Sequence, residues 1–317
     1  MKKINLLSAR KSANQICFSK AFDEFITDSA ARGLSDKTLY TYRNHLHCVS
    51  LHLDISTPLV KLTKEQLNEM VVSMRGAGLA SNTIKSYTRV VKTFLNWCNK
   101  QGYTSVQIQE YKAEETIKET YTDEELTALL ERPSPTCRFS VFRTWVIVNF
   151  LLNSGCRAGT LRNIQNCDVD LEAHQVICRH NKNGKIQVIP LCSQMVTILR
   201  EYKKIRGGAA NDYLFCDEFG EQMSENALRL AVARYNKSRG VEKTSIHLFR
   251  HTFARKYLVD CGGNAFTLQR LLGHSTLQMT KHYCNIFDAD IAKNYDSFSP
   301  LAQMKVNKER IIRSRRK

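Results

Sequence analysis

The sequence His-Leu-Phe-Arg-His at residues 247–251 is followed by Leu-Leu-Gly-His at residues 271–274 and by Tyr283. The guanidinium of Arg250 is a fixed fork of donors that matches a phosphate group. Imidazoles exchange protons near neutral pH, and a tyrosine phenol can act as a covalent nucleophile. Together these groups predict nucleophilic attack on a phosphodiester without a metal ion.

This segment resembles the C-terminal signature of the tyrosine recombinases, which include phage integrases and Xer-type enzymes. The family pattern is His-x-x-Arg-His, then Leu-Gly-His, then a tyrosine at a fixed interval. Tyr283 follows His274 by nine residues, which is the family interval, whereas Tyr295 does not. The resemblance implies that His247, Arg250 and His274 act on the scissile phosphate and that Tyr283 is the nucleophile.

Arg157 resembles the first arginine of the family, which stands in a motif of the form Thr-Gly-Leu-Arg-Ile-Ser-Glu-Leu. It follows a glycine break at Gly155, as in the family. The sequence departs from the motif at Cys156, at Ala-Gly in positions 158–159, and at Thr160, which replaces the usual glutamate. The missing carboxylate removes a contact that would orient the arginine, but the catalytic charge remains.

The family also places a general-acid lysine on the turn of a β-hairpin. Lys182 precedes Pro190 by eight residues, which is the family spacing. The resemblance therefore favours Lys182 over Lys185, although a lysine on a turn is otherwise an ordinary surface residue. His247 and His251 stand four residues apart, but Leu248 occupies the position where a zinc protease motif needs glutamate.

The composition predicts a polyanionic partner. The 317 residues contain 47 lysines and arginines against 30 acidic residues, a net charge of +17. The resemblance implies that this partner is double-stranded DNA. No apolar run approaches the ~18 residues that span a bilayer, and we expect neither a signal peptide nor a membrane role. The 11 cysteines are scattered, without metal-ligand spacing. We therefore expect a reducing cytoplasm, no metal and no cofactor.

The periodicity of residues 18–103 predicts a bundle of about four helices. Gly-Leu at residues 33–34 and at residues 78–79 is expected to end one helix, with Ser35 and Ser81 capping the next. Thr63 begins a capping box for a helix through Met74. This part resembles the core-binding domain of the recombinases, and its candidate phosphate contacts are Lys37, Arg43, Lys85, Arg89 and Lys92.

The second half mixes helices with a hairpin. A capping box at residues 122–125 opens a helix through Leu130, and an apolar helix is expected from about Phe139 to Asn153. Alternating apolar residues at 175–178 and 186–190 flank a turn at 181–184 that contains Asn-Gly, which predicts a β-hairpin. Further helices should begin at Ser193 and Ser224 and continue to about residue 296.

The expected fold is mainly α with a small β-sheet. We expect a basic leader (1–13), a helical core-binding domain (14–106), a linker (107–120), a mixed α/β catalytic domain (121–296) and a basic tail (297–317). The resemblance, which covers about residues 18–296, implies that the two domains close around DNA as a C-shaped clamp. Apolar residues after Tyr283 favour docking of the C-terminal segment on a neighbouring protomer, with packing on the same protomer as the alternative.

The expected function is site-specific recombination through a 3′-phosphotyrosyl intermediate, without metal or ATP. A homotetramer on paired sites follows from the resemblance, and an accessory DNA-bending or directionality factor is a further partner it allows. Integration and excision of a mobile element is the preferred role, and Xer-type dimer resolution or DNA inversion is the alternative. A type IB topoisomerase, an inactive DNA-binding module and a metal nuclease are competing interpretations. The last would need clustered carboxylates, which the motifs lack.

Overall fold

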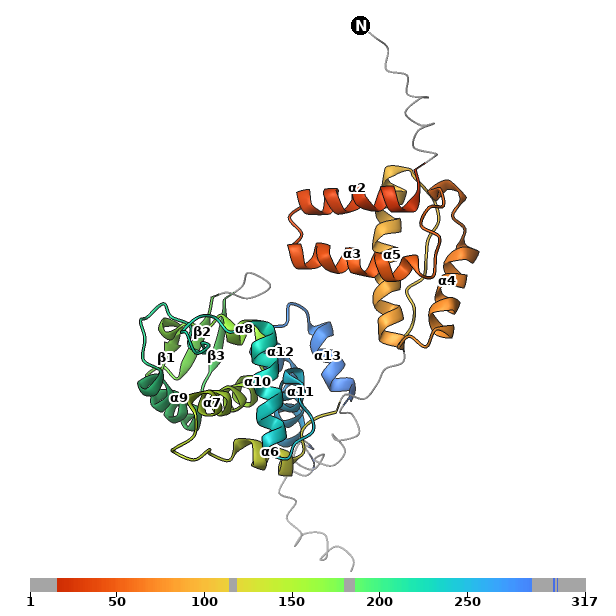
Figure 1. The fold of residues 1–317 in the computed structure, drawn as a ribbon. Helices are drawn as coiled ribbons and strands as arrows, with labels where there is room; N and C mark the ends of the chain where they lie inside the picture. Colours follow the sequence, from red (N-terminus) through yellow and green to blue (C-terminus); the bar gives the residue numbers. More distant parts are fainter. Residues whose placement is uncertain (1–15, 114–118, 180–185, 287–298, 300, 302–317) are drawn as a thin grey trace, which may run out of the picture. The chain divides into compact units, whose positions relative to one another are not determined.

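The computed structural model describes residues 16–113, 119–179 and 186–286, together with Ser299 and Leu301. The chain divides into two compact units, residues 1–116 and residues 117–317. The first unit is helical, and the second combines helices with a three-stranded sheet (Figure 1). The expected mainly α fold with a small sheet is confirmed. No helix in the described ranges is long and apolar enough to cross a membrane.

The N-terminal unit is built around one long helix. Helices α2 and α3 lie side by side and both pack against α5, and α4 packs against α5 as well (Figure 1). The elements are α2 (Phe18–Ala31), α3 (Asp36–Ser50), the short 3-10 helix η1 (Leu59–Lys61), α4 (Lys64–Gly76) and α5 (Ser81–Gln101). The expected bundle of about four helices is therefore present in this part of the chain.

Aromatic rings form the centre of this bundle. The rings of Phe18, Phe22 and Phe25 on α2 lie 4.7, 5.2 and 5.7 Å from the ring of Phe94 on α5, measured between centroids. All four side chains are buried. Phe22 and Phe25 meet Phe94 edge to face, and Phe18 meets it at a tilt. Large rings in such contacts bury much apolar area, so these contacts fix α2 against α5.

The helix starts follow the sequence signals with one correction. Thr63 forms the expected capping box with Gln66, and the side chain of Ser35 accepts a hydrogen bond from the backbone of Thr38. Ser81, however, is the first residue of α5, and Ala80 occupies the N-cap without a side-chain bond. Ser35 and Ala80 therefore occupy the same position after the two Gly-Leu pairs. Both have the extended backbone of an N-cap, but only Ser35 has a side chain that caps the helix.

The segment that follows α5 packs on the N-terminal unit. Ile108 is buried in its core, and Tyr111 packs against the same core. The backbone N–H of Tyr111 donates to the hydroxyl of Thr88 on α5. Residues 108–111, which lie in the stretch expected to be a linker, are thus held against α5 by apolar and polar contacts.

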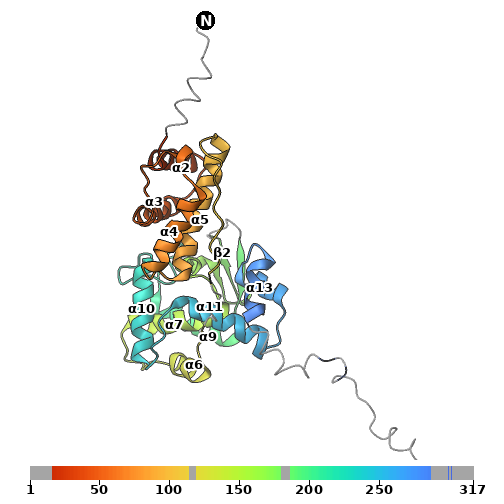
Figure 2. The same ribbon diagram turned by 90° about the vertical axis from the view of Figure 1, so that its right-hand side faces the viewer.

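The C-terminal unit surrounds the apolar helix α7 (Phe139–Ser154), whose residues 142–151 are all buried. A helix that is apolar all round must be enclosed, and α6, α9, α10 and α11 pack around it (Figure 2). The helices of this unit are α6 (Asp123–Leu130), α7, α8 (Ala158–Arg162), α9 (Ser193–Arg206), α10 (Glu225–Ser238), α11 (Ile246–Arg255), α12 (Ala265–Leu272) and α13 (Leu277–Ile286).

The sheet contains the expected hairpin and one additional strand. Strand β2 (Gln175–Cys178) pairs antiparallel with β3 (Gln187–Pro190), with Ile177 opposite Val188. The two-residue strand β1 (Val169–Asp170) adds to β2 and follows the short 3-10 helix η2 (Asn166–Asp168). Strand β1 was not predicted, because two residues are too few to show a period. The turn at residues 181–184 lies outside the described residues.

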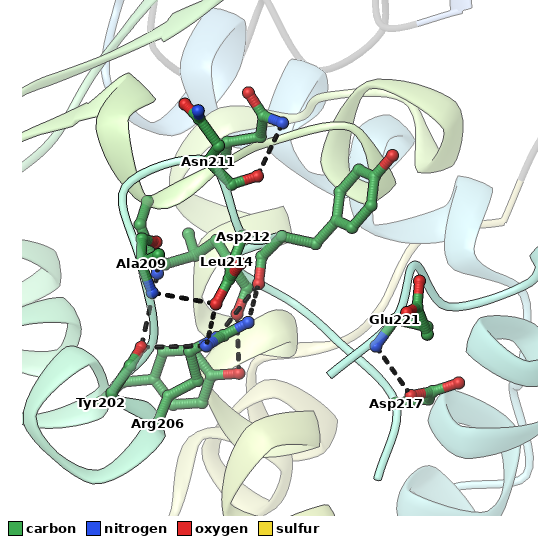
Figure 3. Close-up of polar contacts among 12 residues, drawn as sticks. Tyr202, Arg206, Ala209, Asn211, Asp212, Leu214, Asp217 and Glu221 are labelled. Atoms are coloured by element: carbon green, nitrogen blue, oxygen red, sulfur yellow. Dashed lines mark hydrogen bonds and ion pairs between the residues drawn. The ribbon is translucent and has the colours of Figure 1, made fainter. Parts of the chain in front are cut away.

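The loop between α9 and α10 is held by polar contacts to side chains of α9 (Figure 3). The hydroxyl of Tyr202 donates to the carbonyl of Leu214 at 3.0 Å, and Arg206 donates to the carbonyl of Tyr213. The loop also accepts backbone hydrogen bonds from residues 166 and 167, just after α8. These contacts fix the chain that follows the N-cap of α8, which is Arg157.

Candidate active site

Arg250 lies in the interior of the C-terminal unit, on α11, with only 5% of its surface exposed. Its Nη1 donates to the carbonyl of Gly155 at 2.9 Å, and its Nη2 donates to the carbonyl of Leu272 at 3.1 Å. Those carbonyls belong to the C-terminal ends of α7 and α12, where the helix dipole is negative. The two backbone oxygens therefore compensate the buried charge of Arg250 and fix the position of its guanidinium group.

Arg157 approaches the same turn from α8. It is half-buried, and its Nη1 lies 3.5 Å from the carbonyl of Gly273, the residue that follows Leu272. Burial first, and the charge of Arg157 second, lower the pKa of Arg250. Two guanidinium groups that repel each other at close range form a site that an anion would stabilise, and a phosphate with two nonbridging oxygens fits that requirement.

Two glycines make this geometry possible. Gly155 has φ +57°, and a Cβ there would lie 2.5 Å from the ring of Phe253. Gly273 has φ +62°, and a Cβ there would lie 2.8 Å from the side-chain oxygen of Gln187. Any other residue at either position would be strained and would displace a neighbour, so the two carbonyl turns that hold the arginines require glycine.

His274 follows the second glycine and is buried between an arginine and a hydroxyl. Its Nε2 lies 2.5 Å from Nη2 of Arg250, and its Nδ1 lies 2.8 Å from the hydroxyl of Thr280. Burial first, and then the charges of Arg250 and Arg157, lower the pKa of His274 to about 4. The imidazole is therefore neutral near pH 7 in the absence of DNA.

Tyr283 is buried on α13, with 6% of its surface exposed. Its ring stacks on the imidazole of His274, with centroids 5.9 Å apart and an interplanar angle of 13°. The ring of His251 lies 5.4 Å from the ring of Tyr283. Tyr283 acts to raise the pKa of Arg250, first through charge and then through a hydrogen bond. The predicted nucleophile thus lies beside two of the predicted phosphate ligands.

The other predicted residues, His247 and Lys182, are not placed in this buried cluster by the described structure. His247 is exposed in the first turn of α11, one turn before Arg250, and takes part in contacts within the unit. His251 packs on Tyr283, so it belongs to the surroundings of the site. Lys182 and its competitor Lys185 lie outside the described residues. The structure brings Arg157, Arg250, His274 and Tyr283 together.

Four contributors were not predicted from the sequence. The carbonyls of Gly155 and Leu272 carry no side-chain signal, and Thr280 looked like an ordinary helix residue. Gln187 on β3 donates from Nε2 to the carbonyl of Leu271 at 2.6 Å and so ties the hairpin to the turn before His274. The position of Gln187 beside the hairpin turn is the only sequence signal that could have suggested it.

The basic residues proposed for the N-terminal unit lie on two helices. Lys37 and Arg43 are exposed on α3, and Lys85, Arg89 and Lys92 recur along α5. Arg89 pairs with Glu110 at 2.8 Å. The hydrogen bond from Arg89, followed by the charges of Arg89, Lys85 and Lys92, lowers the pKa of Glu110. The three cations of α5 therefore face one carboxylate, and we call them and Glu110 the α5 basic face.

Within the described ranges, no group of three or more histidine, cysteine or acidic side chains could hold a metal ion. Cys156, which replaces leucine in the first-arginine motif, is buried, and burial raises its pKa to about 11. Thr160, at the position of the usual glutamate, is buried on α8. Both departures from the motif are thus accommodated in the interior.

Residues 119–290, more than half of the chain, match the phage integrase family. The chain belongs to the phage integrase family. The integrase domain begins just before α6 and contains every predicted catalytic residue from Arg157 to Tyr283. This membership confirms the expected enzyme class, a tyrosine recombinase that transfers DNA strands.

Similar proteins extend the likeness beyond the integrase domain. The tyrosine recombinase XerC of Roseiflexus castenholzii is 26% identical over 280 residues, which cover 84% of this chain and 88% of that protein. The Tn1549 transposon integrase in complex with transposon right end DNA has a TM-score of 0.71 at 19% identity, covering 88% of this chain and 99% of that one. A lambda integrase tetramer bound to a Holliday junction has a TM-score of 0.68 at 20% identity, with 86% and 82% covered. The structural likenesses show the shared fold.

Proposed function

We propose that this recombinase cuts and rejoins duplex DNA at specific sites through a 3′-phosphotyrosyl link to Tyr283. The observation that carries the proposal is the buried cluster of Arg250, His274 and Tyr283, with Arg157 at its edge. The cluster places a phenol beside the buried guanidinium of Arg250, and the charge of Arg157 acts on the same site. Such preorganised positive charge stabilises a pentavalent transition state without reorganisation.

In the proposed cleavage step, Arg157 and Arg250 bind the nonbridging oxygens of the scissile phosphate. The Tyr283 oxygen attacks phosphorus while His247 assists removal of the phenolic proton, and the bond to the 5′-oxygen breaks. Lys182 gives the departing oxygen its proton, and His274 donates a hydrogen bond to the phosphate. Attack by the 5′-hydroxyl of a partner strand reverses the sequence. The phosphotyrosine conserves the bond energy, so neither ATP nor a divalent metal is required.

Duplex DNA is the proposed partner of both units. The cations of the α5 basic face and the two cations of α3 would contact phosphates of the DNA half-site that the N-terminal unit binds. The net charge of +17 supports this contact. Closure of the two units around the duplex belongs to the same proposal. Four protomers on two paired sites are proposed by analogy with the lambda integrase tetramer on a Holliday junction. The C-terminal segment proposed for docking lies outside the described residues.

The biological role has two candidates. The curated XerC relatives favour Xer-type resolution or inversion within one molecule, and chain and relative cover each other over most of their lengths. The integration and excision of a mobile element has the transposon integrase fold as support. Sequencing the DNA beside the gene distinguishes them: element ends with inverted repeats around a short spacer favour mobility, and a lone chromosomal site favours resolution.

A suicide substrate tests the chemistry. A nick close to the cleavage site lets the short fragment diffuse away, so cleaved DNA stays attached to the protein. We expect Tyr283→Phe to bind this DNA normally and to form no adduct, because the phenolic oxygen is the bonding atom. Tyr295→Phe is the matched control and should form the adduct at the parental rate. An adduct on the Tyr283→Phe protein would refute the proposal.

A further inference from the structure

The hydroxyl of Thr280 is the feature of the site that the proposed chemistry leaves unused. Thr280 is fully buried on α13, three residues before Tyr283, and its Oγ1 lies 2.8 Å from Nδ1 of His274. One helix therefore carries both the proposed nucleophile and the group that contacts the distal nitrogen of the histidine. A buried hydroxyl is costly unless it has a hydrogen-bond partner, and the imidazole of His274 supplies that partner.

The partners of His274 determine where its proton lies. A guanidinium only donates, so Nε2, at 2.5 Å from Nη2 of Arg250, must be the acceptor. A neutral imidazole carries one proton, which is then on Nδ1, and Nδ1 donates to the oxygen of Thr280. The opposite tautomer would set the N–H of Nε2 against the N–H of Arg250.

We propose that Thr280 is a positioning residue that holds His274 with its proton on Nδ1 and its Nε2 toward the phosphate site. This inference rests on the proposed roles of Arg250, His274 and Tyr283. When a phosphate oxygen takes the place of Nε2 at Arg250, a proton from solvent on Nε2 converts the imidazole into a donor to that phosphate. Nδ1 donates to Thr280 in the neutral and in the protonated form, so one hydroxyl serves both states.

The charged and titratable groups around His274 define the expected pH dependence. Among the described residues, Arg250 on α11, Arg157 at the start of α8 and Tyr283 on α13 act on or contact His274, and His251 on α11 packs on Tyr283. Both arginines and burial disfavour the imidazolium, and the bound phosphate would favour it. Removal of the Thr280 oxygen leaves the Nδ1 proton unpaired, which disfavours the imidazolium further.

The test compares Thr280→Val, which keeps the shape of the side chain, with Thr280→Ser, which keeps the oxygen. The single-turnover rate of adduct formation is measured at saturating DNA between pH 6 and pH 8.5, as a ratio to the parent protein. We expect the valine variant to be slower by about tenfold to a hundredfold. The defect should be largest at high pH and should shrink toward pH 6, where protonation of His274 is easier. The serine variant should restore most of the rate at every pH.

A loss that is the same at every pH, or a serine variant as slow as the valine variant, would show a packing role only and overturn the inference. Nitrogen-15 NMR of the imidazole in the unsubstituted protein gives a second answer that does not depend on folding of a variant. A proton on Nδ1 supports the inference, and a proton on Nε2 contradicts it. Tyr283→Phe is assayed in parallel: an adduct on that variant refutes the proposed function and leaves the NMR result on Thr280 standing.

Discussion

The two units of the molecule carry positive charge in opposite ways. Arg250 is buried in the C-terminal unit and held by two backbone carbonyls, whereas Arg89 on the α5 basic face is exposed and pairs with one carboxylate. A buried and fixed guanidinium acts strongly on an anion that binds beside it, because no water screens it and it has nothing to reorganise. An exposed guanidinium is screened by water and salt, and another cation can take over its contact with the anion. The difference fits our proposal that the C-terminal unit performs the chemistry while both units contact the DNA.

The largest expected effect concerns the leaving group. Lys182→Ala should slow cleavage of ordinary DNA by ~10²- to 10⁴-fold, the range of general acid–base catalysis. The same variant should cleave at nearly the parental rate when sulfur replaces the 5′-bridging oxygen, because a thiolate leaves without a proton. Lys185→Ala is the matched control and should be close to normal on both substrates. Rescue by sulfur in Lys185→Ala and not in Lys182→Ala would move the general acid to Lys185.

The sequence identified the reactive groups better than their supports. The interval between His274 and Tyr283 and the glycine before Arg157 predicted the cluster, because side-chain chemistry at fixed spacing is visible in a single chain. The carbonyls of Gly155 and Leu272 were not visible, since every residue has a carbonyl and only the fold decides which ones converge.

Other differences have a similar physical origin. Strand β1 is stabilised by its pairing with β2 and not by any local pattern. Ala80 replaces the expected serine at the start of α5, where packing of the helix outweighs a missing cap. Ile108 and Tyr111 lie in a polar stretch that was expected to be a linker, but both pack in or against the core of the N-terminal unit. The long apolar helix α7 was predicted almost to the residue.

A smaller effect is expected on the α5 basic face. Lys85→Ala should weaken binding of every DNA sequence to a similar degree and lower the slope of log affinity against log salt by ~1, because one phosphate contact is lost. Lys100→Ala, near the end of the same helix, is the control and should leave the slope unchanged. Fluorescence anisotropy over a range of salt concentrations measures both. A loss confined to one DNA sequence would indicate a base contact at Lys85 instead.

The smallest expected effect removes the carboxylate of this face. Glu110→Gln should raise DNA affinity by about 1.5- to 5-fold at low salt, the range of an exposed ion pair, because Arg89 no longer has to leave its partner. The gain should vanish in high salt. Glu69→Gln, an exposed acid on α4, removes the same charge elsewhere and controls for net charge. Equal gains in both variants would show that only overall charge matters.

The comparison between the two arginines is tested most directly by replacing each with lysine, which keeps the charge and removes the fork. The measurement is the single-turnover rate of adduct formation at saturating DNA, so that differences in binding do not enter. We expect Arg250→Lys to be slower by ~10²-fold or more, because the buried site depends on the fixed geometry of the guanidinium. Arg89→Lys should react within about twofold of the parent, because an exposed phosphate contact needs only charge. Equal rates for the two variants would contradict the division of labour between the buried cluster and the exposed face.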